Sequence, residues 1–159
     1  MRLSDYSDFT LRVLMLCARE PERRLTISEL AQSLQVSKNH LMKIVSDLAR
    51  QGILETTRGR GGGVRLLAAA ESIRIGDVVR RSETDFRIAR CFDALSDDCT
   101  LTPSCRLRGV LQHALAAYLS ELDAVTLAQV ARPVTRPAGA VRRNVTVALP
   151  RSRRPAQGR

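Results

Sequence analysis

The chain has 159 residues and a formal net charge of +10. That length allows one domain with a substantial core, with or without appendages. No apolar run approaches the roughly 20 residues that a membrane span requires, and the opening MRLSDYSDF lacks the apolar segment of a secretory signal. We therefore expect a cytoplasmic protein with no membrane partner. In that reducing compartment, clustered cysteines more often serve metal or redox chemistry than disulfides.

The positive charge is concentrated at the C-terminal end. Residues 132–159 contain eight arginines and no acid, which leaves 18 basic and 16 acidic side chains, a net charge of +2, for residues 1–131. We expect this Pro/Arg-rich tail to be disordered, either as a simple solvated extension or as a source of non-specific attraction to nucleic acid. Aromatic residues make up only 3% of the chain, too few for a base-stacking platform, which favours duplex DNA over single strands as the partner.

A first helix is expected over residues 6–18. Phe9, Val13, Leu16 and Cys17 share one stripe at helical spacing. Cys17 on that stripe is most simply a small buried hydrophobe.

Two further helices follow and are joined by a short turn. The segment TISELAQSLQ predicts a helix with Thr26 or Ser28 as its N-cap. Ser37 can cap the next helix, SKNHLMKIVSDLARQ, and Gly52 is placed to end it. Two helices in this arrangement predict a helix-turn-helix.

A β-hairpin is expected directly after the third helix. Strand-like runs at 53–57 and 64–67 flank a glycine-rich turn at 59–63. A phosphate-binding nucleotide loop is the rival interpretation, but such a loop lies between a strand and a helix, whereas strand-like residues follow these glycines. The predicted fold is therefore mainly α with a small β wing, a winged helix-turn-helix.

The N-terminal part of the third helix and the tip of the wing are the predicted DNA contacts. The first residues of a recognition helix face the major groove, where Asn and Lys can donate to base edges. Arginine on a flexible wing suits the minor groove. Without the helix-turn-helix context the lysines would simply form a solvated helix face. The predicted DNA-binding residues are Ser37, Lys38, Asn39, His40, Lys43, Arg58 and Arg60.

A long amphipathic helix is expected over residues 105–131. Its single apolar stripe needs a partner surface, either on its own domain or on a second copy, and we expect a homodimer because most DNA-binding proteins of this kind bind paired half-sites. The predicted organisation is a winged helix-turn-helix domain (1–82), a cysteine-rich loop (83–106), this dimerisation helix and the basic tail (132–159).

Three cysteines occupy the polar loop. Cys91, Cys99 and Cys105 stand as C-x7-C-x5-C. Zinc sites usually pair ligands as C-x2–4-C, which is absent, and a disulfide would leave one thiol over. The polar surroundings give no reason for unconnected buried thiols. Iron–sulfur clusters tolerate wide and uneven spacing, so a cluster is one of the open interpretations.

The chain resembles the NsrR–IscR family of iron–sulfur winged-helix regulators over roughly residues 1–130. The resemblance rests on the opening MRLSDYSDFTLRVLMLCA, on the pattern L-x-x-x-G-[IL]-[LV]-x-[ST]-x-R-G-x-x-G-G from Leu48 to Gly63, and on the three-cysteine loop before a long helix. It implies a dimeric transcription repressor, not an enzyme, that binds double-stranded operator DNA and carries a cluster.

The resemblance also implies which ligand completes the cysteine set. IscR-like members carry a histidine three residues after the last cysteine and hold a 2Fe–2S cluster, but here that position is Arg108, which cannot ligate. NsrR-like members are nitric-oxide-sensing repressors that use three cysteines and an N-terminal aspartate of the other subunit. Asp8 occupies the matching place. The implied metal ligands are Cys91, Cys99, Cys105 and Asp8, around a 4Fe–4S cluster, with 2Fe–2S as the alternative.

Alternatives remain open for the ligand and for the function. Without the family, Asp8 would simply be an acid favoured at a helix N-terminus. The function could instead be a 2Fe–2S regulator that senses redox state or iron–sulfur supply, or a cluster-free DNA-binding protein with redox-active thiols. No acid/base pair or activated nucleophile points to an enzyme. The other candidate fourth ligands are His113, His40, Asp5 (expected to precede the first helix), Asp93, Asp97 and Asp98.

Overall fold

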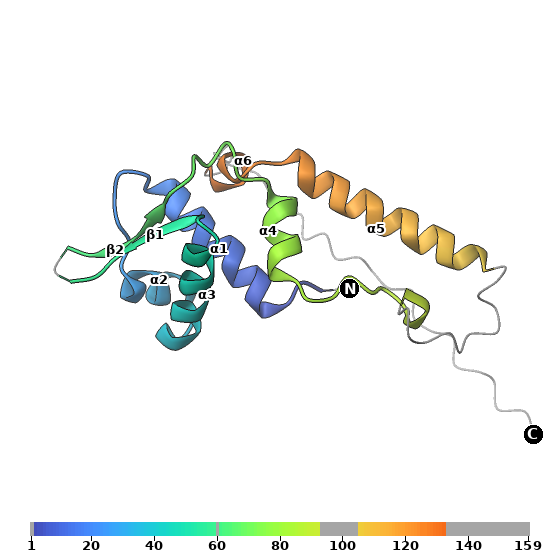
Figure 1. Cartoon of the computed structure of the whole chain (residues 1–159), viewed down its shortest axis with the longest axis horizontal. Coiled ribbons are helices and arrows are strands. Elements are labelled where there is room, and N and C mark those ends of the chain that lie inside the picture. Colours follow the sequence, from blue (N-terminus) through green and yellow to red (C-terminus); the bar gives the residue numbers. More distant parts are fainter. Residues whose placement is uncertain (1, 60, 93–104, 133–159) are drawn as a thin grey trace, which may run out of the picture.

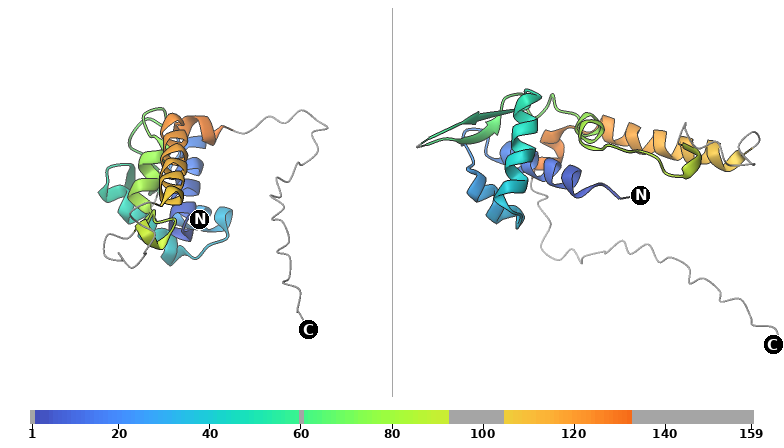
Figure 2. Two further views of the ribbon diagram at one scale, coloured as in Figure 1. Left: turned by 90° about the vertical axis from the view of Figure 1, so that its right-hand side faces the viewer. Right: turned by 60° about the horizontal axis from the view of Figure 1, so that its bottom comes forward.

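The computed structural model describes residues 2–59, 61–92 and 105–132. Figures 1 and 2 show a helical body with the β-hairpin at one end, and a long helix, α5, that extends away from the other end. No helix within these ranges is long and apolar enough to cross a membrane. The elements are α1 (Asp5–Arg19), α2 (Ile27–Leu34), α3 (Lys38–Arg50), β1 (Leu54–Thr57), β2 (Gly63–Leu66), α4 (Ile75–Ser82), the 3-10 turn η1 (Arg90–Phe92), α5 (Arg106–Ala124) and α6 (Leu127–Ala131).

Hydroxyl side chains cap the helices of the helix-turn-helix. Thr26, rather than Ser28, begins α2 with a capping box: its Oγ1 accepts from the Glu29 N–H at 3.2 Å, and the Glu29 carboxylate accepts from the Thr26 N–H at 2.7 Å. Ser37 caps α3 as predicted. Between the two helices Gln35 adopts a left-handed backbone with φ of 54°, which turns the chain tightly enough to bring α3 across α2.

Gly52 ends α3, as predicted. Its φ is 72°, and its N–H donates to the Ala49 carbonyl at 3.0 Å, the left-handed conformation that glycine adopts without steric cost after a helix. The chain then enters β1 directly, which confirms a hairpin immediately behind the helix-turn-helix.

The hairpin is antiparallel and attached to the body at its root. Its register pairs Leu54 with Leu66 and Thr56 with Val64. Val64 also exchanges two backbone hydrogen bonds, of 2.8 and 2.9 Å, with Leu25 in the α1–α2 connection. A Cβ on the neighbouring Gly63 would lie 2.8 Å from the Leu25 carbonyl oxygen, so this close approach requires glycine.

The core lies where α1 packs against α3, α4 and α6. Of the predicted α1 stripe, Val13 and Cys17 are buried, whereas Phe9 and Leu16 are half-buried and pack against the core. Periodicity did not anticipate α6 as a separate helix, which packs on α1. The residues of α1 that are buried are Ser7, Thr10, Val13, Leu14 and Cys17.

The structure divides the helix expected over 105–131 into α5 and α6. Val125 and Thr126 are extended, with ψ of 133° and 159°, and Thr126 starts α6 through a capping box with Gln129. The N–H of Leu127 donates to the Ile73 carbonyl at 2.8 Å. Apolar residues keep their helical spacing across this break, so hydrophobic periodicity does not reveal the break. The Thr-x-x-Gln sequence is the local signal.

Candidate DNA interface and cluster-binding segment

The outer face of α3 carries most of the predicted DNA contacts. Lys38, Asn39 and Lys43 are exposed, while the opposite face of the helix enters the core. Ser37 is also exposed, and its hydroxyl accepts from the His40 N–H at 3.3 Å. Figure 1 shows α2 and α3 beside the hairpin, at the end of the body opposite to α5. One end of the molecule therefore presents a basic helix face and the wing together.

His40 is placed differently from its neighbours. Its side chain is half-buried and meets the ring of Phe9 edge to face, with centroids 5.5 Å apart and planes at 74°. Its Nε2 is buried and has no hydrogen-bond partner within the described ranges. The imidazole thus supports α3 on α1 rather than projecting beside Lys38 and Lys43.

Met42 is a residue of this face that sequence reasoning missed. Its side chain is 50% exposed and lies one turn after Lys38, next to Lys43. As an apolar residue it resembles a member of the buried stripe. Its spacing from Leu41 and Ile44, however, places it on the opposite side of the helix.

The wing supplies one described arginine. Arg58 is exposed, and Arg60 lies outside the described residues. Gly59 and Gly61 have φ of 93° and 77°, so the wing tip turns where other residues would be strained. At the wing root Glu55 accepts from Arg24 at 3.0 Å and from Arg65 at 2.5 Å, which lowers the pKa of its carboxyl. The Glu55 carboxylate stays ionised, but two arginines balance its charge, so it does not repel DNA phosphates as an unpaired anion would.

Two of the three loop cysteines are described, and they lie at the two ends of the segment 93–104. Cys91 is in η1 and Cys105 is the N-cap residue of α5, while Cys99 lies outside the described residues. Both described thiols are half-buried and free. The Cys105 side chain makes no capping hydrogen bond. Accessible, uncommitted thiols are the donor set that an iron–sulfur cluster takes, so these residues fit that group.

Cys17 contrasts with the loop cysteines. It is buried in the core as predicted, with 1% of its surface exposed, and burial raises the pKa of its thiol to about 12. Because metals bind the thiolate, the position and ionisation of Cys17 both exclude it from the ligand set.

Asp8 lies in the first turn of α1, and its carboxylate is 43% exposed. It forms an ion pair with Arg12, one turn later, with an Nη2–Oδ2 distance of 2.9 Å. Across the described ranges no three His, Cys, Asp or Glu side chains gather as a metal site, so Asp8 does not join Cys91 and Cys105 within one chain. Figures 1 and 2 show η1 beneath the far half of α5, outside the helical body that holds most of α1.

The other candidate ligands are placed as follows. Asp5 does not precede α1 but is its first residue, and it pairs with Arg2. His113 is exposed on α5. Asp93, Asp97 and Asp98 lie outside the described residues.

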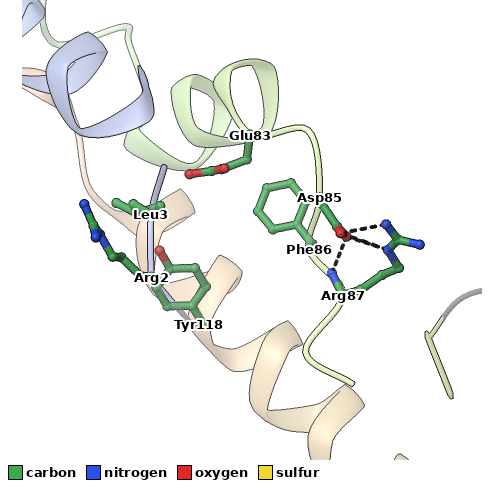
Figure 3. Close-up of a pocket in the computed structure, with 7 residues that line it drawn as sticks. All are labelled: Arg2, Leu3, Glu83, Asp85, Phe86, Arg87 and Tyr118. Carbon is green, nitrogen blue, oxygen red and sulfur yellow. Dashed lines mark hydrogen bonds and ion pairs between the residues drawn. The ribbon is translucent and has the colours of Figure 1, made fainter. Parts of the chain in front are cut away.

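A hollow of about 270 Å³ lies where three segments that lead to the predicted ligands meet (Figure 3). The residues before α1, the chain that runs from α4 toward η1, and α5 each contribute to its wall. Asp85 accepts from the side chain and the N–H of Arg87, at 2.9 and 2.7 Å, and these bonds lower the pKa of its carboxyl. The lining residues are Arg2, Leu3, Glu83, Asp85, Phe86, Arg87 and Tyr118.

A helix-turn-helix followed by a two-stranded wing defines a winged-helix DNA-binding protein. The Rrf2 family model, described as an iron-dependent transcriptional regulator, matches residues 3–133, and the chain belongs to this family. Its similarity to individual relatives agrees with this family assignment. The HTH-type transcriptional regulator NsrR of Bacillus subtilis is 48% identical over 128 residues, which cover 80% of this chain and 88% of that protein. NsrR of Geobacillus kaustophilus is 45% identical over 129 residues, with the same coverage of 80% and 88%.

Solved structures show the same fold. The oxidized form of Staphylococcus aureus CymR superposes with a TM-score of 0.67 at 21% identity, over 86% of this chain and 100% of that one. T. potens IscR gives a TM-score of 0.66 at 20% identity, over 87% and 94%. The predicted winged-helix fold and the NsrR-like family membership are therefore confirmed. The chain is a transcription regulator and not an enzyme.

Proposed function

We propose that this regulator is a dimeric repressor whose iron–sulfur cluster senses nitric oxide, and that reaction of the cluster releases operator DNA. The observation that carries the proposal is the position of α1. This helix holds the proposed ligand Asp8 in its first turn and packs directly on the recognition helix α3. A change in how α1 is held would therefore act directly on the helix proposed to contact DNA.

Two contacts join the N-terminal half of α1 to α3. The Tyr6 hydroxyl donates to Asp47 at 2.7 Å, and the Phe9 ring packs against His40. Burial, with the Asp47 bond, raises the pKa of Tyr6 to about 12, so the phenol keeps its proton and this hydrogen bond even at alkaline pH. Because Asp8 lies between Tyr6 and Phe9 in sequence, a force on its carboxylate acts on the turn that touches α3.

Four residues would hold the cluster: Cys91, Cys99 and Cys105 of one chain and Asp8 of the partner subunit. When bound, the cluster supplies the iron atoms that react with nitric oxide. Asp8 has an alternative partner, since Arg12 of its own helix already binds it at 2.9 Å. An oxygen ligand with a competing cation one turn away is the easiest of the four to displace. Its loss would release α1 from the partner's cysteine segment.

The exposed side of α5 supports a dimer. Not one residue of α5 is buried in the single chain, and Leu107 and Val110 are 63% and 62% exposed. With Ala114 and Ala117, which are also exposed, they form an apolar stripe along one side of the helix. A second copy that covers this stripe would bring the two cysteine segments and the two α1 helices into one assembly.

The test uses anaerobically purified protein, in which nitric oxide is titrated while operator binding and the visible absorption of the cluster are followed. We expect DNA affinity to fall in step with cluster reaction. Unchanged affinity after complete reaction would refute the proposal. Native mass spectrometry of the same sample distinguishes a 4Fe–4S from a 2Fe–2S cluster, and a colourless, iron-free protein would favour the cluster-free alternative.

Asp8→Ala tests the fourth ligand. We expect a cluster that is lost faster, and a weaker response of DNA binding to nitric oxide, because one ligand is missing. Asp5→Ala removes the same charge from the same helical turn and breaks the surface pair with Arg2, and we expect its cluster to match the wild type. An Asp8→Ala protein whose cluster is as stable as that of the wild type would exclude Asp8 as a ligand, and loss of the cluster from Asp5→Ala instead would assign the ligand to Asp5.

A further inference from the structure

The junction between α5 and the body contains a two-point ion pair. Arg80 of α4 binds the Asp123 carboxylate in the last turn of α5, with Nη2 2.6 Å from Oδ2 and Nη1 bonded to Oδ1. The Asp123 bond raises the pKa of Arg80, and the Arg80 bond lowers the pKa of Asp123. Both side chains are about 40% exposed (40% and 42%), so the pair adds little to overall stability. Its planar, two-point geometry instead fixes orientation.

Gly76 leaves the space that the Asp123 carboxylate occupies. A Cβ at this position, in the first turn of α4, would overlap Oδ1 of Asp123 and lie 2.9 Å from Nη1 of Arg80. Glycine is otherwise unfavourable inside a helix, and the backbone of Gly76 does not need a positive φ. A Cβ at this position would therefore displace the Asp123 carboxylate from its place beside Arg80. The helix N-terminus adds partial positive charge beside it.

Backbone hydrogen bonds fix where α5 ends but leave its direction to other contacts. The N–H of Ile75 donates to the Val125 carbonyl at 3.0 Å, and the N–H of Leu127 donates to Ile73 at 2.8 Å. These bonds lie just beyond the end of α5. In the last turn of α5 the Asp123–Arg80 pair holds the helix against α4, together with the Arg74 side chain, which donates to the Ala124 carbonyl at 3.3 Å, and Leu122, which packs against the core. The pair is the charged, two-point contact among these, and its geometry restrains the direction in which α5 leaves the body.

The direction of α5 matters because the helix is long. Its 19 residues span about 28 Å at 1.5 Å per residue. A swing of about 10° would move its far end by about 5 Å, more than the roughly 3.4 Å rise of one base pair. Figure 1 shows that α5 and the α3–wing surface lie at opposite ends of the body, so rotation at the junction also reorients α3 relative to the partner subunit.

We propose that Gly76, Arg80 and Asp123, the junction triad, set the angle between α5 and the body and thereby determine which half-site spacing the dimer accepts. This inference rests on the proposed dimeric DNA binding. The three residues are positioning residues: they belong to neither the predicted DNA contacts nor the predicted ligands. They act through the direction of α5.

The experiment measures spacing preference. An operator with paired half-sites is selected from a random duplex library with the wild-type protein, and variants are made with one or two base pairs added to or removed from its centre. We expect the wild type to prefer one spacing by about tenfold or more. Asp123→Asn, which keeps the shape and removes the charge, should reduce that preference to about threefold or less. Affinity for a single half-site should not change.

Gly76→Ala makes the test specific to this geometry. Alone it should weaken the spacing preference as Asp123→Ala does, because its Cβ displaces the carboxylate. In an Asp123→Ala background it should add nothing, because the carboxylate that it would displace is gone. Additive effects of the two substitutions would overturn the inference.

Arg23→Ala is the matched control. It breaks a 2.6 Å ion pair with Glu29 in the body, away from α5, and should keep the wild-type spacing profile. Junction variants that keep this profile too would overturn the inference and leave the proposed function intact. A wild-type protein that binds no paired half-sites would overturn both. A melting curve for each variant shows that it is folded before its DNA binding is compared.

Discussion

Burial separates the three cysteines that the structure describes into two kinds. Cys17 is enclosed between helices, where the apolar surroundings oppose ionisation and hold its pKa near 12. Cys91 and Cys105 are half-buried at the ends of a polar segment and free. At the scale of single residues, the surroundings rather than the residue type decide which thiols are available to iron.

Cys17→Ala is therefore expected to affect stability and not the proposed cluster. Removing the buried sulfur leaves a small void, and the free energy of unfolding should fall by about 1 kcal/mol. Iron content after anaerobic reconstitution should match the wild type. Cys91→Ala is the comparison: it should lose the cluster while the apo protein melts near the wild-type temperature. Loss of iron from the Cys17→Ala protein would contradict this division.

His40 shows how a residue can be correctly placed in sequence and still differ in role from its neighbours. It stands in the first turn of α3, among exposed residues, but its ring faces Phe9. Conversely, apolar Met42 lies on the exposed face. Residue type alone would suggest that the histidine is exposed and the methionine buried. The reverse holds, because the rotation of α3 on α1 determines which side chains project.

At the scale of elements, capping boxes determine where α2 and α6 begin. The α2 box depends on ionised Glu29, whose carboxylate accepts from the Thr26 N–H and binds Arg23 at 2.6 Å. These bonds lower the pKa of Glu29 from 4.5 to about 2. The folded state thus favours the charged form more strongly than the unfolded chain does.

The resulting pH dependence has a defined sign. Because the folded pKa of Glu29 is the lower one, its contribution to stability is fully present above about pH 4.5 and is lost as the pH falls toward 2. Glu29→Gln can keep the backbone bond of the box but cannot titrate. Urea unfolding between pH 2 and 6 should therefore show a shallower loss of stability for this variant than for the wild type. Parallel pH profiles would contradict the assignment.

Thr26→Ala tests the other half of the box. Loss of the N-cap oxygen should lower the free energy of unfolding by about 1 kcal/mol at neutral pH. Ser28→Ala is its control, because Ser28 was the rival N-cap and lies exposed inside α2. Equal destabilisation by the two substitutions in thermal melts would argue against the box seen here.

At the scale of the whole molecule, α5 is the element that a single chain leaves incomplete. Leu107 and Val110 face solvent at the end of the helix farthest from the body. We expect Leu107→Glu with Val110→Glu to yield a folded monomer, because burying two carboxylates at a dimer seam is costly and exposing them in the monomer is not. Gln112→Glu, also on the exposed surface but off the stripe, should remain dimeric. Light scattering after size-exclusion chromatography measures the mass of both variants. A double variant that remains dimeric would exclude this stripe as the dimer interface.

Much of the fold could be predicted because its determinants are local. Ser37 begins α3, Gly52 ends it, and the glycines before Val64 permit the hairpin; each acts within a few residues of itself. The break before Thr126 escaped periodicity because both sides of it are apolar at helical spacing. Phe9 and Leu16 lie on the predicted stripe of α1 but are only half-buried, because elements distant in sequence, such as α6, decide which part of the helix surface is covered.

The sequence by itself determined the winged helix-turn-helix, its basic outer helix, and three thiols at a spacing that iron–sulfur ligation tolerates. These depend on caps, turns and residue spacing, which short-range chemistry sets. Only the tertiary structure decided that α6 packs on α1, that His40 supports α3, and that Asp123 lies on Gly76 beside Arg80. Each of these requires segments distant in sequence to meet at atomic distance, and packing of the whole body determines where they meet.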